Sequence, residues 1–246
     1  MGVAVITEGE LILKKVLISL IVLLSVCVVG MTPEKASAAT KNITTDFSTK
    51  IKQNAIRIAY YAMNDSTYPI GTGREFASKV KTGGPWDYKL KYGPKKKYIF
   101  DTKGGCYNPT GEDLGNIHYG YVGRAAGFSD SFLRTAAGAY QIYSGTSKVK
   151  WYKSYFDDPK DQKMIDLGLR LYKNNWLITN WNKASLSSKS VGTFTVQSVS
   201  PKTITNLDKQ FDVLSDKEKK EIRERAIKNA KLIKAGKEDQ FIESNN

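Results

Sequence analysis

One apolar run limits what this chain can fold into. It extends from Val16 to Met31, follows Lys14-Lys15, and precedes Ala36-Ser37-Ala38. A positive segment, a short apolar segment and small residues at A-x-A spacing are the three parts of a secretory signal peptide. The run is shorter than the roughly 20 residues that a membrane-spanning helix needs. We therefore expect cleavage after Ala38, a secreted (extracellular) product, and no stable membrane insertion after signal cleavage.

Cleavage leaves a basic chain with one cysteine. The full chain has 246 residues, with 38 Lys+Arg against 24 Asp+Glu and a net charge of +14. Residues 1–38 hold three basic and three acidic residues, so the net charge survives their removal. Cys106 is the one cysteine that remains, so no intrachain disulfide forms and a hydrophobic core has to hold the fold. Such a charge indicates an anionic partner: nucleic acid, a cell-envelope polymer or an acidic protein.

Apolar periodicity and capping residues predict a mainly α fold (α+β with minor β). We expect a compact helical core domain over 39–174 and a C-terminal extension over 175–246 that ends in an amphipathic helix. Ser129, Asp158-Pro159 and the Ser215/Glu218 capping box mark helix starts. The predicted helices cover 46–63, 74–81, 113–126, 130–143, 158–174 and 215–235. Residues 86–100 are expected as a loop or irregular hairpin, and 191–199 as a strand.

Small residues mark one expected helix–helix contact. Gly120, Gly123 and Ala126 lie in the predicted helix 113–126, and Ala136 and Ala137 lie in 130–143. Small side chains let helix backbones approach closely. We therefore expect these two helices to pack against each other through these positions.

The only histidine, His118, lies among other reactive groups. Glu112, Asp113, Tyr119, Tyr121 and Arg124 are within a few residues of it. A ribonuclease without a metal needs one group to take the 2′-OH proton, one to protonate the leaving oxygen, and a cation to hold the developing charge. An unperturbed histidine titrates near neutrality and suits proton transfer. With one histidine, the second acid or base has to be Glu112, Asp113, a tyrosine or a lysine.

Four blocks follow one another in the sequence: Gly84-Pro-Trp-Asp-Tyr-Lys89, Asp113 to Gly127, Ala136-Ala-Gly-Ala-Tyr-Gln-Ile142 and Phe156-Asp-Asp-Pro-Lys-Asp-Gln162. Together they resemble the bacterial polymorphic toxin type 44 domain over about 80–174. The resemblance implies a toxin domain that is generally regarded as a nuclease, with ribonuclease favoured over deoxyribonuclease, and it allows for a cognate immunity protein. Because a signal peptide rather than a long delivery region precedes the domain, we expect a stand-alone secreted relative.

The resemblance also points to particular side chains. Its matching polar positions are Trp86, Asp87, Asn116, His118, Tyr119, Arg124, Gln141, Asp157 and Asp158. Family members can carry Asn where this chain has His118, which shifts weight toward Asp87, Asn116 and Arg124. The expected catalytic residues are therefore His118, Arg124, Asp87, Asn116 and Asp113.

A lysine run with interleaved tyrosines indicates how nucleic acid would be bound. Lys95, Lys96 and Lys97 are expected to contact phosphates, and Trp86 and Tyr119 to contact bases. Neither a cofactor nor a His/Cys metal site is expected. Two alternatives stay open: a non-catalytic binding protein for anionic cell-envelope polymers, and a wall hydrolase with Glu112 or Asp157 as the acid.

Overall fold

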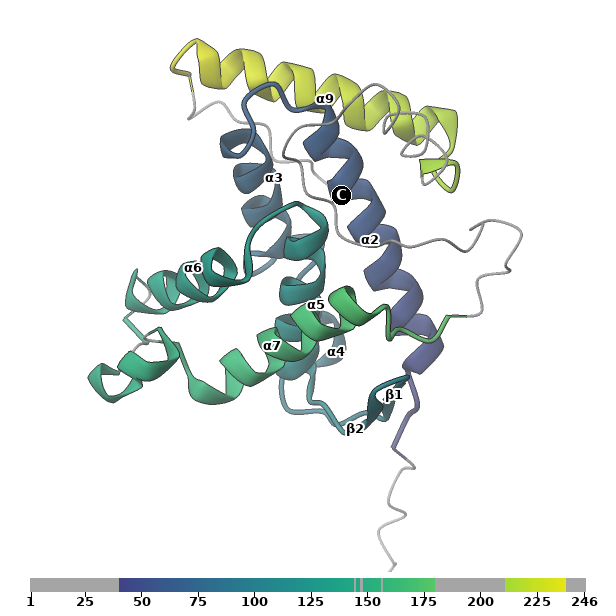
Figure 1. Cartoon of the computed structure of the whole chain (residues 1–246), viewed down its shortest axis with the longest axis vertical. Helices are drawn as coiled ribbons and strands as arrows, with labels where there is room; N and C mark the ends of the chain where they lie inside the picture. Colours follow the sequence, from purple (N-terminus) through teal and green to yellow (C-terminus); the bar gives the residue numbers. More distant parts are fainter. Residues whose placement is uncertain (1–39, 144, 147, 156, 180–210, 238–246) are drawn as a thin grey trace, which may run out of the picture. The chain divides into compact units, whose positions relative to one another are not determined.

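The computed structural model describes residues 40–143, 145–146, 148–155, 157–179 and 211–237 (Figure 1). The predicted signal peptide and the predicted strand 191–199 lie outside these residues. Residues Thr40–Asn246 form one compact unit. Its described part is helical apart from one two-stranded sheet, which confirms a mainly α fold with minor β. In this part of the chain, no helix has the length and apolar character to cross a membrane.

Helix α2 (Thr44–Asn64) supplies one wall of the core. Phe47, Ile51 and Ile58 on its inner face are fully buried, as the apolar period of the sequence predicts. The helix ends at Asn64, and the Asp65 carboxylate accepts the backbone N–H groups of Thr67 (2.8 Å) and Thr72 (2.6 Å). These bonds hold the turn into α3 (Ile70–Val80).

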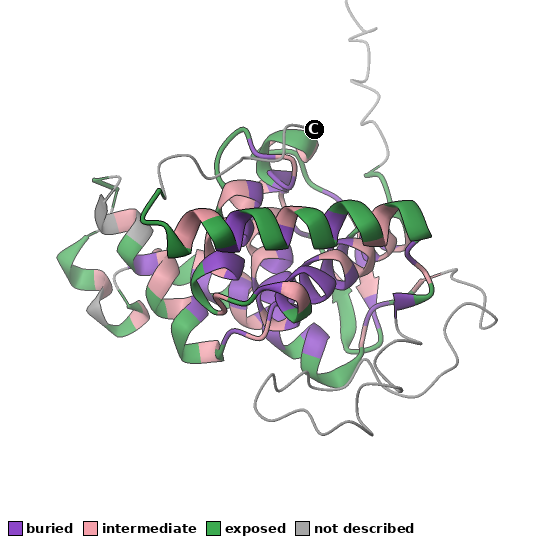
Figure 2. Cartoon of the chain, turned by 90° about the horizontal axis from the view of Figure 1, so that it is seen from above, coloured by how far each residue is buried: buried purple, intermediate pink, exposed green. Residues whose placement is uncertain are grey.

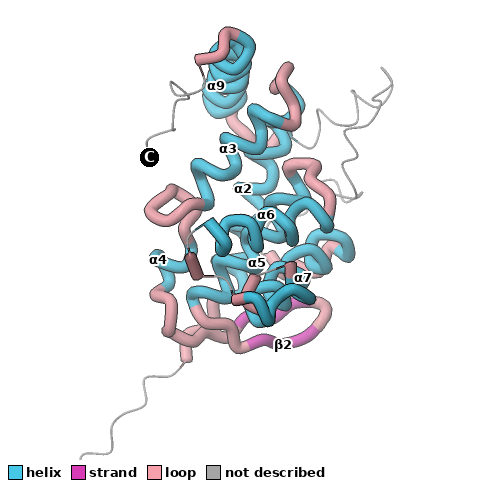
Figure 3. The backbone as a smooth tube through the Cα atoms, turned by 90° about the vertical axis from the view of Figure 1, so that its left-hand side faces the viewer, coloured by secondary structure: helices cyan, strands magenta, loops and turns pink. Residues whose placement is uncertain are grey.

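A short helix and a small hairpin follow α3. Helix α4 (Tyr88–Tyr92) is capped by Asp87, and strands β1 (Phe100–Thr102) and β2 (Gly105–Tyr107) pair antiparallel. The hairpin lies at one end of the fold, below α5 and α7 (Figure 3). Residues 86–100, expected as a loop or irregular hairpin, therefore include helix α4, and the hairpin itself spans 100–107. Elements of three to five residues are too short to show a hydrophobic period.

Three helices form the centre of the unit: α5 (Gly111–Ala125), α6 (Asp130–Tyr143) and α7 (Pro159–Asn174). The short 3₁₀ helix η1 (Val149–Ser154) joins α6 to α7. The predicted caps are confirmed, since Ser129 accepts the backbone N–H of Phe132 (3.1 Å) and Asp158 accepts that of Lys160 (2.8 Å). Helix α5 begins with a capping box of Thr110 and Asp113.

The closest neighbour of α5 corrects one expectation. Gly120 lies against the backbone of Ile165 in α7, and Gly168 of α7 lies against the backbone of Ile117. The α5–α6 contact exists at Gly123, which faces the side chain of Leu133. The small residues of α5 thus allow contacts with two helices, and the backbone of α5 approaches that of α7 more closely than that of α6.

Helix α9 (Asp216–Lys234) packs on α2 and α3 (Figure 1). It begins at the predicted Ser215/Glu218 capping box, and Gly236 follows it with a positive φ of 65°. Its inner face buries Ile222, Ala226 and Ala230, whereas exposed residues run along its outer face (Figure 2).

Candidate nucleic-acid interface

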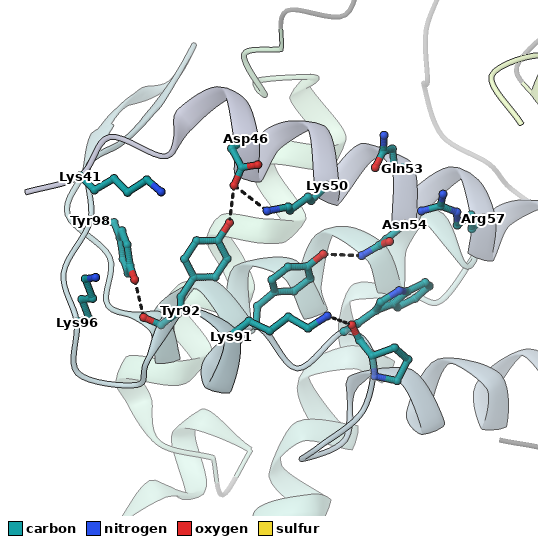
Figure 4. A pocket seen from close by; sticks show the side chains of 13 residues that line it. Lys41, Asp46, Lys50, Gln53, Asn54, Arg57, Lys91, Tyr92, Lys96 and Tyr98 are labelled. Atoms are coloured by element: carbon teal, nitrogen blue, oxygen red, sulfur yellow. Dashed lines mark hydrogen bonds and ion pairs between the residues drawn. The ribbon is translucent and has the colours of Figure 1, made fainter. Parts of the chain in front are cut away.

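A pocket of about 550 Å³ opens between α2 and α4 (Figure 4). Helix α2 contributes one wall, α4 contributes the other, and residues just before α2 and after α4 close the ends. Five cations and four aromatic side chains line it, with a single carboxylate. The lining residues are Lys41, Asp46, Lys50, Gln53, Asn54, Arg57, Pro85, Trp86, Tyr88, Lys91, Tyr92, Lys96 and Tyr98.

Each tyrosine ring of the pocket carries a lysine ammonium group. The Nζ atoms lie 5.8 Å from the Tyr92 ring centroid for Lys50, 5.5 Å from Tyr88 for Lys91, and 5.7 Å from Tyr98 for Lys96. These distances are within the range of cation–π attraction. The pocket therefore places positive charge directly beside aromatic rings. Tyr88 and Tyr98 are buried (5% and 4% exposed), so the half-buried Tyr92 ring is the one that a base could reach beside a cation.

The α2 wall was missed by the sequence interpretation, although a signal for it exists. Asp46, Lys50, Gln53, Asn54 and Arg57 lie at positions i, i+4, i+7, i+8 and i+11 and so share one face of the helix. The apolar period of this segment predicts only the face that is buried in the core. A polar face alone does not show which element it will meet, and here it meets α4.

His118 lies behind the pocket rather than in it. Its side chain is 1% exposed and is enclosed by the rings of Trp86 (5.7 Å between centroids) and Tyr88 (4.5 Å). Burial and the nearby charge of Lys91 lower the pKa of His118 to about 3. The sequence predicts a histidine that titrates near neutrality. Burial therefore removes that property, and the ring is neutral at working pH.

The neutral imidazole fixes the pocket floor. The Asn54 amide Nδ2 donates to Tyr88 Oη (3.0 Å) and lies 3.0 Å from His118 Nε2. If Nε2 accepts this second amide hydrogen, the ring proton resides on Nδ1, which has no hydrogen-bond partner among the described residues. This geometry makes His118 a support for Asn54 and Tyr88, two residues that line the pocket.

Two expected site residues also hold the α4 wall. Asp87 accepts the backbone N–H groups of Leu90 (3.1 Å) and Gly83 (2.9 Å), so it acts as the N-cap of α4. Trp86 is buried but lines the pocket, with the Lys79 ammonium 5.3 Å from its ring centroid. Both residues shape the pocket wall.

Arg124 and Tyr119 lie elsewhere on α5. The Arg124 guanidinium pairs with Asp130 (3.1 Å) and donates to the carbonyl oxygen of Phe128 near the helix end. Tyr119 donates its hydroxyl to the Leu133 carbonyl oxygen (3.0 Å) and packs on Phe76. Neither residue lines the pocket.

The three lysines expected to bind phosphate do not all reach the pocket. Lys95, Lys96 and Lys97 are all exposed, and of the three only Lys96 lines the pocket. Lys97 instead belongs to a β-bridge with Thr110. Lys41, Lys50, Arg57 and Lys91 supply the other cations of the pocket.

A second polar region joins the four sequence blocks on the other side of α4. Lys89 pairs with Glu112, Lys160 pairs with Asp113 (2.8 Å), and Gln141 donates to Asp161 (3.3 Å). Gln162 donates to Asp157 (2.8 Å). Asp113 belongs to this region, while Asn116 lies one turn further along α5 and is half-buried. We refer to Glu112, Asp113, Asp157, Asp158 and Asp161 as the carboxylate cluster.

Two members of the carboxylate cluster titrate near neutrality. Burial raises the pKa of Asp157 to about 6, against the hydrogen bond from Gln162. Burial and the charges of Asp157 and Glu112 raise the pKa of Asp161 to about 6. In contrast, hydrogen bonds from Lys160 and Thr110 outweigh the effect of burial and lower the pKa of Asp113. The pKa values of Asp157 and Asp161 therefore suit proton transfer near neutral pH. Asp161 is half-buried, whereas Asp157 is only 2% exposed, so a ligand can reach only Asp161 directly.

Among the described residues, no group of three or more His, Cys, Asp or Glu side chains is arranged to hold a metal ion.

Comparison with known proteins finds a family match over the segment that contains α4 and the carboxylate cluster. Residues 75–174 match the model of the family described as bacterial toxin 44. This match confirms the resemblance of the four blocks and supports a toxin-like function. The segment extends from α3 to the end of α7, so α2 precedes it and α9 follows it. No curated protein and no solved structure matches the chain.

Proposed function

We propose that the protein is a secreted toxin that binds and cleaves RNA. The observation that carries the proposal is the pocket between α2 and α4, with five cations and four aromatic side chains around about 550 Å³. Cations beside aromatic rings are the common means of binding single-stranded nucleic acid, because phosphates meet the cations and bases stack on the rings. RNA is favoured because the resemblance to the toxin family implies a ribonuclease, and because proteins read RNA sequence mostly on single-stranded segments.

The alternative is a protein that binds anionic envelope polymers without cleaving them. Its cations would serve equally well, because electrostatic attraction does not depend on the polymer. The half-buried Tyr92 ring favours nucleic acid, since a sugar- or polyol-phosphate polymer offers no base to stack on it. Turnover separates the two functions, because only the nuclease shortens its ligand.

The chemistry is assigned to the carboxylate cluster and not to His118. Asp161, the half-buried member of the pair, takes the 2′-OH proton as that oxygen attacks phosphorus, and burial together with the charge of the buried Asp157 raises its pKa. The P–O5′ bond then breaks, and the protonated Asp161 gives the proton to the leaving 5′ oxygen. The products are a 2′,3′-cyclic phosphate and a 5′-hydroxyl. Helix α4 contributes Lys91 to the pocket and Lys89 to the cluster, so a strand that crosses this helix meets both.

A cleavage assay tests this proposal. Protein secreted from the full-length chain is incubated with single-stranded RNA in the presence of a metal chelator. We expect shortened RNA with 2′,3′-cyclic phosphate ends, and a loss of about 10²–10⁴-fold in turnover for Asp161→Asn. Binding without cleavage would favour the envelope-polymer alternative. Cleavage only after magnesium is restored would contradict the metal-independent mechanism.

Export and protection belong to the same proposal. The secreted protein begins at Ala39, and N-terminal sequencing checks this. A cell that makes such a toxin needs a cognate immunity protein. Co-expression with the neighbouring open reading frame is therefore expected to relieve the growth defect that the mature protein causes.

A further inference from the structure

Asp46 is the only carboxylate among the lining residues, all of which the structure describes. A carboxylate repels phosphate, so binding of the RNA phosphate backbone does not explain why Asp46 lies among five cations. It lies in the first turn of α2, where negative charge stabilises the helix. That effect does not require it to line the pocket. Its position there marks a place for an uncharged part of the ligand that donates hydrogen bonds.

Only one of the two carboxylate oxygens of Asp46 accepts hydrogen bonds from the described residues. Oδ2 accepts from Lys50 Nζ (2.8 Å) and from Tyr92 Oη (3.0 Å), as Figure 4 shows. Oδ1 has no partner among the described residues, and 56% of the side chain is exposed. Although burial opposes ionisation, the hydrogen bonds from Lys50 and Tyr92 outweigh it and lower the pKa of Asp46. The carboxylate therefore remains an acceptor at working pH.

A base stacked on the Tyr92 ring would lie close to this acceptor. Its hydroxyl is bonded to Asp46, so a base stacked on the ring presents its edge toward the carboxylate. The ring is half-buried, contacts the rings of Phe47 (5.5 Å between centroids) and Tyr98 (5.2 Å), and also carries the Lys50 ammonium group. A phosphate that binds Lys50 would draw the ammonium from the ring and from Oδ2. The place that Lys50 occupies on the ring, and the carboxylate, would then become available to the base.

We propose that Asp46 selects guanine at this position of the RNA. Guanine has two neighbouring donors, N1–H and N2–H, on its Watson–Crick edge, and a carboxylate accepts both. Adenine and cytosine each place a ring acceptor beside their amino group, and uracil flanks its one N–H with two carbonyl oxygens. These acceptors repel the carboxylate. The inference rests on the proposed function, since it names the base that the RNA-binding pocket prefers.

Binding of short RNA analogues tests the inference without interference from cleavage. The ligands are 2′-O-methyl trinucleotides with the sequences UGU, UIU, UAU and UUU, and calorimetry on the intact secreted protein gives their dissociation constants. We expect UGU to bind about tenfold or more tightly than UAU and UUU. Inosine lacks the N2 amino group, so UIU is expected to bind more weakly than UGU.

The isosteric variant Asp46→Asn isolates the carboxylate. It is expected to reduce the preference for UGU to below about twofold, whereas Glu221→Gln, on the exposed part of α9, retains it. Thermal denaturation confirms that both variants fold. Equal binding of all four trinucleotides, or an unchanged preference in Asp46→Asn, would overturn the guanine assignment alone. Failure of the wild-type protein to bind any of them would overturn the proposed function as well.

Discussion

At the residue scale, burial lowers the pKa of His118 and gives a reactive side chain a structural role. The sequence identifies it as the one histidine and places it among acids, tyrosines and an arginine. The fold encloses it between Trp86, Tyr88 and Asn54. Burial depends on α2 and α4, which lie at least 26 residues away in the chain, so no local pattern could predict it. Its role in the structure is to position Asn54 and Tyr88.

The lowered pKa of His118 predicts sensitivity to acid. The unfolded side chain gains a proton below pH 6.5, while the folded one resists protonation until about pH 3. Stability is therefore lost as the pH falls through this window, by roughly 3 kcal/mol at pH 4. His118→Asn, which has no charge to gain, is expected to lose less stability between pH 7 and pH 4. Chemical denaturation at each pH measures this, and parallel curves for the two proteins would contradict it.

Asp157 predicts the opposite pH dependence. Its pKa is about 6 in the folded protein against 3.8 in the reference state. Ionisation therefore destabilises the fold increasingly from pH 4 to pH 6, and the full effect persists above pH 6. Asp157→Asn removes this cost and is expected to stabilise the protein by about 1–3 kcal/mol at pH 7.5, with little gain at pH 4. Denaturation curves at the two pH values check this, and a variant destabilised at pH 7.5 would refute it.

At the element scale, the long helices were predictable because their signals are local. Ser129, Asp158-Pro159 and Ser215/Glu218 begin helices as predicted. Helix α4 and the β1–β2 hairpin were not predicted, since they form through contacts with distant segments. Ile99, just before β1, bonds the backbone beside α2 at Lys41 (3.0 Å) and at Ile43 (3.0 Å). The small residues of α5 signalled close packing, but not which helix it would meet.

The α5–α7 crossing predicts opposite effects for two glycines on one helix. A Cβ atom at Gly120 would lie well inside van der Waals distance of the Ile165 carbonyl oxygen. At Gly115 the nearest atom is 3.4 Å away, an ordinary contact. Gly120→Ala is therefore expected to destabilise the protein by about 1–3 kcal/mol. Gly115→Ala is expected to be neutral or to stabilise by up to about 1 kcal/mol through helix propensity. Equal effects in urea denaturation would argue against this packing.

At the scale of the whole molecule, α9 connects the C-terminal extension to helices that begin the fold. Arg225 pairs with Glu75 of α3 (3.0 Å), and Asn229 donates to Tyr61 of α2 (3.0 Å). Helix α2 also forms one wall of the pocket, so α9 supports an element of the candidate site. The capping box predicted α9, whereas its docking depends on a buried carboxylate that no local pattern reveals.

The ion pair between Arg225 of α9 and Glu75 of α3 allows the contribution of α9 to stability to be measured. Its side chain is fully buried between Lys79 (3.1 Å) and Arg225. Arg225→Ala removes one of these two cations and is expected to destabilise the protein by about 1–3 kcal/mol, because a buried carboxylate loses compensation. Lys217→Ala, on the exposed part of α9, is expected to change stability by less than about 0.5 kcal/mol. Similar thermal unfolding of the two variants would show that α9 is held by other contacts.

RNA binding by the pocket between α2 and α4 is tested most directly by comparing two variants that have the same net charge. Lys91→Ala/Lys96→Ala removes two pocket cations, and Lys217→Ala/Lys220→Ala removes two exposed cations from α9. Fluorescence anisotropy with single-stranded RNA, repeated over a range of salt concentrations, gives the affinity and its salt dependence. We expect the pocket variant to bind at least about tenfold more weakly, with a logarithmic salt slope shallower by about 1.4, and the α9 variant to resemble the wild type. Equal losses in the two variants would mean that net charge alone attracts RNA, and would contradict the pocket.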